Sequence, residues 1–308
     1  MKISVIIPTF NPSLERLSNV LVGLQNQDLP VDQWQLVIVD NASTNSVLLS
    51  VDLTWHPNHV IIREDKPGLT YARIRGFEHA SADIIVLVDD DNVLRKDYLT
   101  SAIRFLSKNS TIGIVGGKAL PVYEKEPPVW FKDLGIALGC RDLGDDTITS
   151  NFHHVGKTAI TSYPTYAPIG TGMVLRKAVA EVYSLHAKNS SAITDRKGKS
   201  LSSGGDNEMV IVGINDGWEI GYFPDLVVDH LIPKNRLEIK YLARMNHQSF
   251  KSWVQLLRNH DMSPWATIPR WSVSLRKAKA YFTHKAWKNT ANRIKWRGAC
   301  GMYDGLKA

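Results

Sequence analysis

The 308-residue sequence contains only two cysteines, Cys140 and Cys300. Neither belongs to a spacing typical of metal sites, and one pair is not a disulfide framework, so a reducing compartment is favoured. No window approaches the roughly 18 consecutive apolar residues of a membrane-spanning helix. The first strand-like run ends at Pro8, which is too short for the hydrophobic part of a signal peptide. We therefore expect a cytoplasmic protein without a membrane span.

A dinucleotide fingerprint is also missing. Residues 3–7 resemble a strand and are followed by a sharp turn and a helical pattern, but no GxGxxG motif accompanies them. Dinucleotide-dependent dehydrogenases are therefore disfavoured. Further strands are predicted at residues 34–39, 60–63 and 83–88, and helical spacing of apolar residues occurs between them. This alternation predicts an α/β fold.

Acidic residues are scarce in the last quarter of the chain. Residues 1–230 carry 21 Lys and Arg against 27 Asp and Glu, whereas residues 231–308 carry 16 against 3. The net charge of +7 therefore belongs entirely to the C-terminal stretch. We expect an α/β body divided into residues 1–115 and 116–232, followed by a basic helical extension over residues 233–308 that has its own anionic partner.

The most informative pattern is the apolar run at residues 84–88, which ends in Asp89, Asp90 and Asp91. Most of the run is β-branched, so it predicts a buried strand with acids at its carboxyl end. Alternation along a strand would place Asp89 and Asp91 on one side and Asp90 on the other. Neighbouring carboxylates repel each other unless a cation lies between them. Mg²⁺ or Mn²⁺ with a phosphate is one interpretation, and a solvated acidic turn is the other.

Two other predicted strand ends carry polar residues. Asp40 follows the second strand, where it either binds a base or ribose or caps a helix. After the third strand, Pro67-Gly68 predicts a type II turn and Thr70 a helix N-cap. This places Arg73 in the first turns of a helix directed at the sheet edge. An arginine there suits phosphate, although a solvated helix arginine would be equally ordinary.

Four blocks, SVIIPTFN, VIVDNAST, KPGLTYAR and IIVLVDDDN, resemble the family 2 glycosyltransferases in order and spacing. The resemblance implies an inverting enzyme with a GT-A fold, a Rossmann-like mixed sheet flanked by helices. It implies that Asp91 and Asp89 hold Mn²⁺ or Mg²⁺ as a DxD motif. One departure is Ile74, because the family often has Asn directly after the arginine. The residues implied to bind the nucleotide-sugar are Pro8, Thr9, Asn11, Asp40, Gly68, Arg73, Asp89 and Asp90.

A further block, SGGDNE at residues 203–208, resembles the catalytic motif of the family. The resemblance assigns the catalytic base to Asp206 and an acceptor contact to Glu208. One acid of the motif is replaced here by Gly205. The alternative is that these carboxylates cap a helix and that Glu208 faces solvent.

Three more residues are candidates. Trp130 lies in a Pro-rich aromatic loop suited to an acceptor, and Gly172 lies in a stretch that resembles the family's acceptor-side strand. Core packing would explain both residues equally. Residues 219–230 are predicted to form two strands, the second closed by His230. His230 is either a ligand of the metal or of the diphosphate, or a structural histidine.

Beyond Pro233 the sequence is predicted to be helical, with Trp, Tyr and Phe among many Lys and Arg. Such helices suit an anionic bilayer surface, so peripheral association with the cytoplasmic membrane face is expected. Nucleic acid would bind the same charges but is the less favoured partner. Docking on the acidic body or on a second subunit is the remaining alternative.

The function predicted from these patterns is metal-dependent inverting transfer of a sugar from a nucleotide-diphosphate sugar to a hydroxyl. The acceptor would be a glycan or a lipid-linked molecule in cell-surface polysaccharide or glycoconjugate synthesis. A nucleotidyltransferase that releases pyrophosphate is one alternative, and a catalytically silent nucleotide-binding or membrane-associated scaffold is the other.

Overall fold

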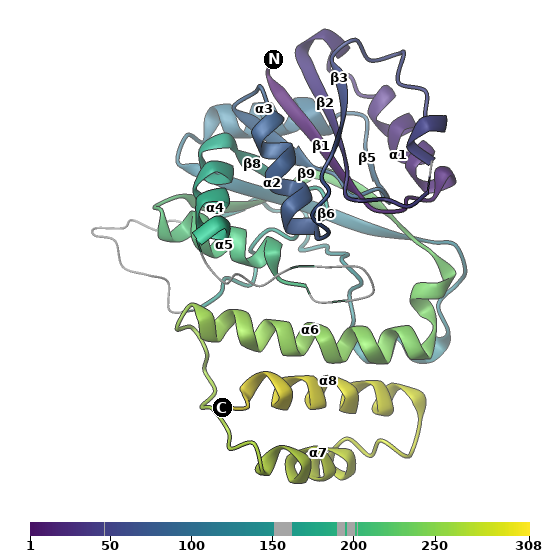
Figure 1. Ribbon diagram of the computed structural model, residues 1–308, viewed down its shortest axis with the longest axis vertical. Helices are drawn as coiled ribbons and strands as arrows, with labels where there is room; N and C mark the ends of the chain where they lie inside the picture. Colours follow the sequence, from purple (N-terminus) through teal and green to yellow (C-terminus); the bar gives the residue numbers. More distant parts are fainter. Residues whose placement is uncertain (46, 151–161, 190–194, 196–200, 202) are drawn as a thin grey trace. The chain divides into compact units, whose positions relative to one another are not determined.

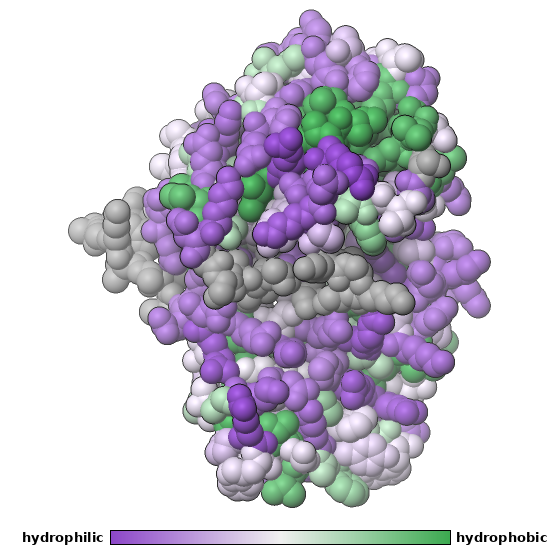
Figure 2. Space-filling model, in the orientation of Figure 1, coloured by the Kyte–Doolittle hydropathy of each residue, from purple (hydrophilic) through white to green (hydrophobic). Residues whose placement is uncertain are grey.

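The computed structural model describes residues 1–45, 47–150, 162–189, 195, 201 and 203–308 (Figure 1). The chain forms two compact units. Unit 1 comprises residues 1–122, 139–192 and 206–231, and unit 2 comprises residues 123–138, 193–205 and 232–308. Figure 2 shows a mostly hydrophilic face on which hydrophobic residues gather in separate areas. The three-part division expected from the sequence stays a prediction.

Unit 1 is built on a mixed sheet with the strand order β3-β2-β1-β4-β8-β6-β9-β5, and β7 pairs with β9. Strands β1 to β4 are mutually parallel, whereas β8 is antiparallel to β4 and β6, and β9 to β5 and β7. The α/β class and the mixed sheet are thus confirmed. Among the described residues the strands are β1 Ile3–Thr9, β2 Trp34–Asp40, β3 His59–Arg63, β4 Ile84–Leu87, β5 Asn92–Leu94, β6 Ile112–Tyr123, β7 Ile148–Thr149, β8 Val174–Arg176 and β9 Glu219–Ile232.

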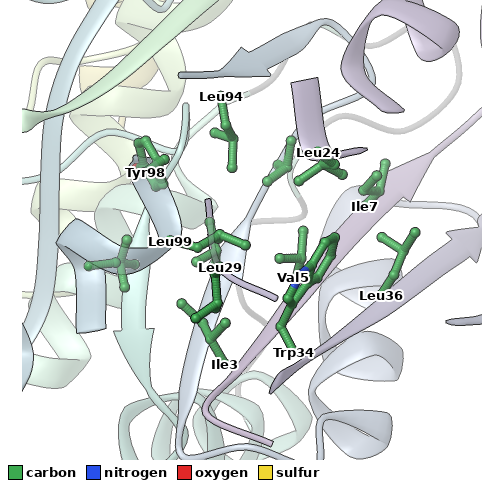
Figure 3. Packing of buried hydrophobic residues seen from close by; sticks show 14 of the residues in the cluster. Ile3, Val5, Ile7, Leu24, Leu29, Trp34, Leu36, Leu94, Tyr98 and Leu99 are labelled. Atoms are coloured by element: carbon green, nitrogen blue, oxygen red, sulfur yellow. The ribbon is translucent and has the colours of Figure 1, made fainter. Parts of the chain in front are cut away.

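Helices cover both faces of this sheet because buried residues alternate along the strands. Ile3, Val5 and Ile7 of β1 pack with helices α1 and α3, whereas Ile6 packs with α2, α4 and α5. Figure 3 shows the first of these clusters, in which Trp34 lies close to Val5 and Ile3. The helices are α1 Leu14–Gln25, α2 Leu69–His79, α3 Tyr98–Lys108, α4 Lys177–Asn189 and α5 Gly205–Asn215, and the short 3-10 helices are η1 Val31–Gln33 and η2 Val47–Ser50.

Three local predictions were wrong. Strand β4 ends at Leu87, so the three acids lie in a turn before β5 and strand alternation does not orient them. Residues 219–230 form one strand, β9, because their partners β5 and β7 pair with different parts of it. The N-cap of α2 is Gly68 and not Thr70, since the φ of +141° at Gly68 turns the chain into the helix there.

The described residues of unit 2 form the long helices α6 Ile239–Asn259, α7 Ser272–Thr283 and α8 Thr290–Leu306, with the 3-10 helices η3 Val129–Leu134 and η4 Lys234–Leu237. Helix α8 packs against α6, α7 and η3. A small core joins Val254, Val273 and Leu306. Within the described ranges, none of the helices has both the length and the apolar character needed to span a bilayer.

Candidate functional site

The carboxyl ends of three parallel strands meet at one edge of the sheet of unit 1. The register pairs Thr9 of β1 with Asp40 of β2, and Asp40 with Arg63 of β3. The Nη1 of Arg63 lies 2.6 Å from Oδ2 of Asp40, and the backbone N–H of Ser43 donates to Oδ1 at 3.0 Å. Because Asp40 is held from two sides, its carboxylate is fixed at the strand end, where a ligand of a parallel sheet binds.

The acidic turn after β4 lies next to this edge. Thr9 Oγ1 donates a hydrogen bond to Oδ2 of Asp90. Burial, followed by the charges of Asp91 and Asp89, raises the pKa of Asp90 to about 6, although the Thr9 hydrogen bond works in the opposite direction. Three carboxylates so close together create a strongly negative local potential. Asp89 and Asp90 are half-buried and Asp91 is buried, so the turn is not fully solvated.

His230 lies beside the most buried acid of this turn. Pairing of β5 with β9 sets Asn92 opposite His230, which brings His230 Nε2 to 3.4 Å from Oδ1 of Asp91. The side-chain amide of Asn92 donates to the same oxygen at 3.1 Å. Both Asp91 and His230 are about 4% exposed. The structure thus brings together two of the predicted metal ligands from residues far apart in the sequence.

The other ring nitrogen of His230 faces a sulfur. Sγ of Cys140 lies 3.7 Å from His230 Nδ1. The preceding residue, Gly139, has a φ of +80°, and a Cβ there would lie 3.1 Å from Cε1 of His230. Glycine at this position lets the backbone approach the imidazole closely. No sequence pattern pointed to Cys140, because its contact with His230 depends on a strand distant in the sequence.

These donors fit a divalent cation. Carboxylate oxygens suit Mg²⁺ and Mn²⁺, and an imidazole nitrogen is accepted more readily by a transition metal than by the harder Mg²⁺. Burial, followed by the charges of Asp91 and Asp89, raises the pKa of Asp90, and a cation would offset the negative charge of these carboxylates. Asp91, Asp89 and His230 are therefore the residues that would hold such an ion, with Mn²⁺ favoured.

Asp206 lies in the first turn of α5, where a carboxylate is favoured by the helix dipole. Its Oδ2 accepts a hydrogen bond from the backbone N–H of Gly170 at 2.9 Å. A Cβ on Gly170 would lie 3.2 Å from that oxygen and 3.1 Å from Nη2 of Arg73. Arg73 is 3% exposed, so it is no solvated helix arginine. Gly170 is thus a point of close approach shared by Arg73 and Asp206.

Two residues overlooked in the sequence surround Asp206. Burial and then the charge of Asp206 hold the pKa of Tyr163 well above its ordinary value, and the hydroxyl of Tyr163 donates to Oδ1 of Asn207 at 3.0 Å. Burial lowers the pKa of Arg141, against the opposing effects of Tyr163 and Asp206. Arg141 remains a cation because arginine starts from so high a pKa. Both residues come from the weakly patterned stretch 140–164, which offered no motif.

The loop before β8 connects these two groups of residues. Gly170 contacts Asp206, and the next residue, Thr171, donates through Oγ1 to the carbonyl of Gly139 at 2.9 Å. Gly139 in turn lies against His230. The acidic turn and His230 therefore lie on one side of this short loop, and the carboxylate of Asp206 lies on the other side. In a nucleotide-sugar the diphosphate is bonded directly to the reacting sugar carbon, so the groups that act on each must lie close together.

Some predicted residues have clear structural roles. Oδ1 of Asn11 accepts hydrogen bonds from the backbone N–H groups of Thr44 and Asn45, at 2.8 and 3.1 Å. Gly172 is buried with a φ of +68°, and its carbonyl accepts from the hydroxyl of Tyr98. Packing thus accounts for Gly172, while direct ligand contacts by both residues stay predictions.

The remaining predicted residues are dispersed. Glu208 is 2% exposed, and its Oε1 lies 3.5 Å from Nε2 of His186, so it does not face solvent. Pro8 is buried within β1. Trp130 belongs to η3 of unit 2, so an acceptor contact by Trp130 stays a prediction.

A polar side chain of the strand-end loops was also overlooked. Asn41 accepts from the N–H of Gly68 through Oδ1 at 2.7 Å and donates to the carbonyl of Lys66 at 2.8 Å. It thereby fastens the loop after β2 to the start of α2. Asn41 stands directly after Asp40 in the sequence, but nothing in that position distinguished a loop-bridging amide from a surface residue.

Residues 4–183, more than half of the chain, match the family model described as glycosyl transferase family 2. The chain is 34% identical over 147 residues to a dolichol-phosphate mannosyltransferase of Pyrococcus furiosus, a match that covers 41% of this chain and 38% of that protein. The chain thus covers well under two thirds of this relative's length.

Two solved structures share the fold. The mannosyltransferase PcManGT of Pyrobaculum calidifontis, in complex with GDP-Man and Mn²⁺, is 20% identical with a TM-score of 0.55, and the likeness covers 97% of this chain and 73% of that chain. Residues 1–349 of TarS from S. aureus, in complex with UDP-GlcNAc, are 15% identical with a TM-score of 0.52, covering 98% and 90%. Both are glycosyltransferase-type folds, as the four sequence blocks predicted.

Proposed function

The chain belongs to glycosyl transferase family 2, and we propose that it is a metal-dependent inverting glycosyltransferase. It transfers a sugar from a nucleotide-diphosphate sugar to an acceptor hydroxyl. The proposal rests on one observation above all, the loop 170–172 with Asp206 on one side and the acidic turn with His230 on the other. A leaving diphosphate needs positive charge, and an incoming hydroxyl needs a base.

The nucleoside and phosphates occupy the strand ends in this proposal. Asp40, held by Arg63, accepts hydrogen bonds from the base, and Thr9 with Asp90 and Asp89 lines the ribose and diphosphate. Arg73, buried beside Gly170, supplies a fixed cation near the transferred group. Pro8, Asn11 and Gly68 shape the loops around the nucleotide.

When bound by Asp91, Asp89 and His230, Mn²⁺ would supply positive charge for the departing diphosphate. The β5–β9 pairing brings two of these residues, Asp91 and His230, next to each other. Asn92 orients Asp91 through its amide.

Asp206 is the proposed general base. A carboxylate at the N-terminus of α5 is anchored through Oδ2 by the Gly170 N–H, which orients its other oxygen. Transfer with inversion requires the acceptor hydroxyl to attack the sugar carbon from the side opposite the diphosphate, while the base removes the hydroxyl proton. Glu208 and Gly172 are proposed acceptor-side residues of unit 1, and Trp130 is a proposed acceptor contact of unit 2.

The proposed acceptor is a glycan or a lipid-linked molecule of a cell-surface polysaccharide or glycoconjugate. The name of the Pyrococcus furiosus relative, a dolichol-phosphate mannosyltransferase, supports a lipid-linked acceptor. We propose a cytoplasmic location, at the membrane face where such an acceptor would be available.

Slow hydrolysis of the donor tests the activity without knowledge of the acceptor, because water can replace the hydroxyl. UDP-GlcNAc and GDP-mannose would be incubated with the protein and Mn²⁺, and release of UDP or GDP would be followed. We expect release from one donor that disappears in Asp91→Asn. Release of pyrophosphate from a nucleoside triphosphate would instead indicate a nucleotidyltransferase, and tight binding without any release would indicate a silent scaffold.

A further inference from the structure

Helix α7 carries a row of exposed hydrophobic side chains. Trp271 is 75% exposed, Leu275 65% and Phe282 66%. The exposed Ala278 lies between Leu275 and Phe282. From Trp271 to Leu275, Ala278 and Phe282 the steps are four, three and four residues, a spacing that places side chains on one face of a helix. Trp287, 54% exposed, extends the row, with its ring 5.8 Å from that of Phe282. We call these four large side chains the α7 ridge.

The opposite face of α7 holds the helix in place within unit 2. Val273 and Ala280 are buried, and Nζ of Lys277 lies 2.7 and 2.8 Å from the two carboxylate oxygens of Asp304 in α8. Nε1 of Trp296 donates to the carbonyl of Lys277 at 3.0 Å. Because these contacts fix the rotation of α7 against α8, the ridge points away from α8. The helix therefore has one hydrophobic face that packs within unit 2 and a second that faces solvent.

Positive charge surrounds the ridge. Residues 262–303 contain nine Lys and Arg and no Asp or Glu. Arg276 and Lys279 of α7 are exposed, as are Lys285 and Lys288 in the turn that follows. In Figure 2 the part around α7 combines hydrophobic and weakly polar residues with strongly hydrophilic ones. Hydrophobic area and cations thus occupy the same surface.

We propose that the α7 ridge docks unit 2 on an anionic lipid bilayer, with α7 lying in the plane of the headgroups. Large apolar side chains on one face of a helix enter the acyl boundary, while flanking Lys and Arg bind anionic headgroups. The helix is 12 residues long, about 18 Å, which suits a position in the interface. The inference goes beyond the transfer reaction, because it names the element that binds the membrane.

Charge and shape favour a lipid bilayer over a second copy of the chain or a nucleic acid as the partner of the α7 ridge. A second copy bound through the same ridge would bring two strongly basic surfaces together, which is repulsive. Single-stranded nucleic acid prefers a basic groove with aromatic platforms for its bases. The ridge lies along a helix and includes Leu275, which has no ring for stacking. A bilayer accepts Leu, Phe and Trp alike.

Vesicle co-sedimentation with the full chain tests the proposal. Vesicles of phosphatidylcholine alone would be compared with vesicles containing phosphatidylserine, in the absence of any nucleotide. The ridge variant combines Trp271→Ser with Phe282→Ser, and the charge variant combines Lys279→Glu with Lys288→Glu. The matched controls in unit 1 are Val22→Ser with Leu49→Ser, which are 53% and 88% exposed, and Lys96→Glu with Lys108→Glu.

We expect binding to the anionic vesicles, at least tenfold weaker binding by each α7 variant, and unchanged binding by the controls. Each surface cation alone accounts for about a fivefold change in affinity. Circular dichroism and nucleotide binding check that the variants remain folded. Equal binding of the ridge variant and its control to the anionic vesicles would overturn the proposal. Self-association or RNA binding through α7, without binding to vesicles, would also overturn it. Donor hydrolysis is a separate assay, so failure of one proposal leaves the other standing.

Discussion

At the level of single residues, a substitution of the proposed base Asp206 tests transfer separately from nucleotide binding. In Asp206→Asn the amide oxygen can still accept the Gly170 hydrogen bond, which the carboxylate accepts at 2.9 Å, but the side chain can no longer remove a proton. We expect the nucleotide affinity to stay within about twofold and the turnover to fall by about 10²- to 10⁴-fold. Calorimetry and donor hydrolysis measure the two effects. Asp146→Asn, at an exposed position, is the control, and full turnover by Asp206→Asn would remove the proposed base.

Cys140 is expected to act through His230. In Cys140→Ala, His230 Nδ1 loses the sulfur at 3.7 Å, so the imidazole is less firmly directed toward Asp91. Loss of such a contact to a metal-binding histidine weakens metal affinity by about tenfold or more. We expect this loss for Mn²⁺ titrated in the presence of nucleotide, with partial recovery in Cys140→Ser, whose hydroxyl can hydrogen-bond. Cys300→Ala changes the cysteine of unit 2 and should leave Mn²⁺ affinity unchanged; equal affinity of all variants would contradict the assignment.

The residues found from the sequence share a local signal. Thr9, Asp40 and Asp89 to Asp91 each follow an apolar run that predicts a strand, so their positions at strand ends could be read directly. Arg141 and Tyr163 could not be found in this way, since they are near Asp206 only because the chain folds back. His230 was a candidate, but its contact with Asp91 depends on pairing between β5 and β9, which are distant in sequence. Such pairing leaves no local pattern.

Among the secondary-structure elements, α8 approaches α6 through its glycines. A Cβ at Gly301 would lie 1.9 Å from the carbonyl oxygen of His247 in α6, and one at Gly305 would lie 2.8 Å from Cβ of Val254. Gly301→Ala must therefore separate the helices, and we expect a loss of about 1–3 kcal/mol in the free energy of unfolding. Urea denaturation measures the loss. Lys295→Ala on the exposed face of α8 should change it by less than about 0.5 kcal/mol. Equal stability of Gly301→Ala and wild type would contradict this close approach.

The segment between η2 and β3 contains a pH-sensitive contact with β2. His56 is fully buried with its ring 4.0 Å from that of Trp34, and its Nδ1 accepts from the N–H of Asn58 at 3.2 Å. Burial, followed by the charge of His59, lowers the pKa of His56 to about 4. The folded protein binds this proton less tightly than the unfolded chain, whose His pKa is about 6.5. The stabilisation is therefore complete above about pH 6.5 and is lost as the pH falls toward 4.

His56→Phe tests this dependence, because a phenyl ring can pack against Trp34 but does not titrate. Between pH 6.5 and 5 the wild type should lose about 2 kcal/mol more of its free energy of unfolding than the variant does. Denaturant titrations at both pH values give the two losses. Equal losses in the two proteins would show that His56 does not carry the effect.

The ends of some strands depend on hydrogen bonds that the sequence pattern does not reveal. The apolar run of β4 extends to Val88, yet the strand ends at Leu87, because the Asp89 N–H and the Asn92 side chain begin a turn. The pattern located the acids correctly but predicted the wrong geometry for their side chains. The sequence pattern predicted two strands within residues 219–230. The pairing of β9 with β5 and β7 keeps it continuous.

For the molecule as a whole, the part of the chain rich in Lys and Arg does not coincide with the second compact unit. The excess of Lys and Arg begins near residue 231, and unit 2 contains this stretch. Unit 2 also takes up residues 123–138, whose helix η3 packs against α8. The sequence showed the basic stretch because composition is a local property. It did not show the partner segment, because a contact between η3 and α8 has no compositional signal.

The most direct measurement is calorimetric binding of UDP, GDP, dTDP and CMP, each with and without Mn²⁺, to the wild type and to Asp91→Asn. We propose that a nucleoside diphosphate binds at the edge formed by Thr9, Asp40 and the acidic turn, with the cation held by Asp91, Asp89 and His230. We expect one nucleotide to bind at least tenfold more tightly with Mn²⁺ and Asp91→Asn to lose this gain. Mn²⁺-independent binding of every nucleotide, or an unchanged gain in the variant, would contradict this site.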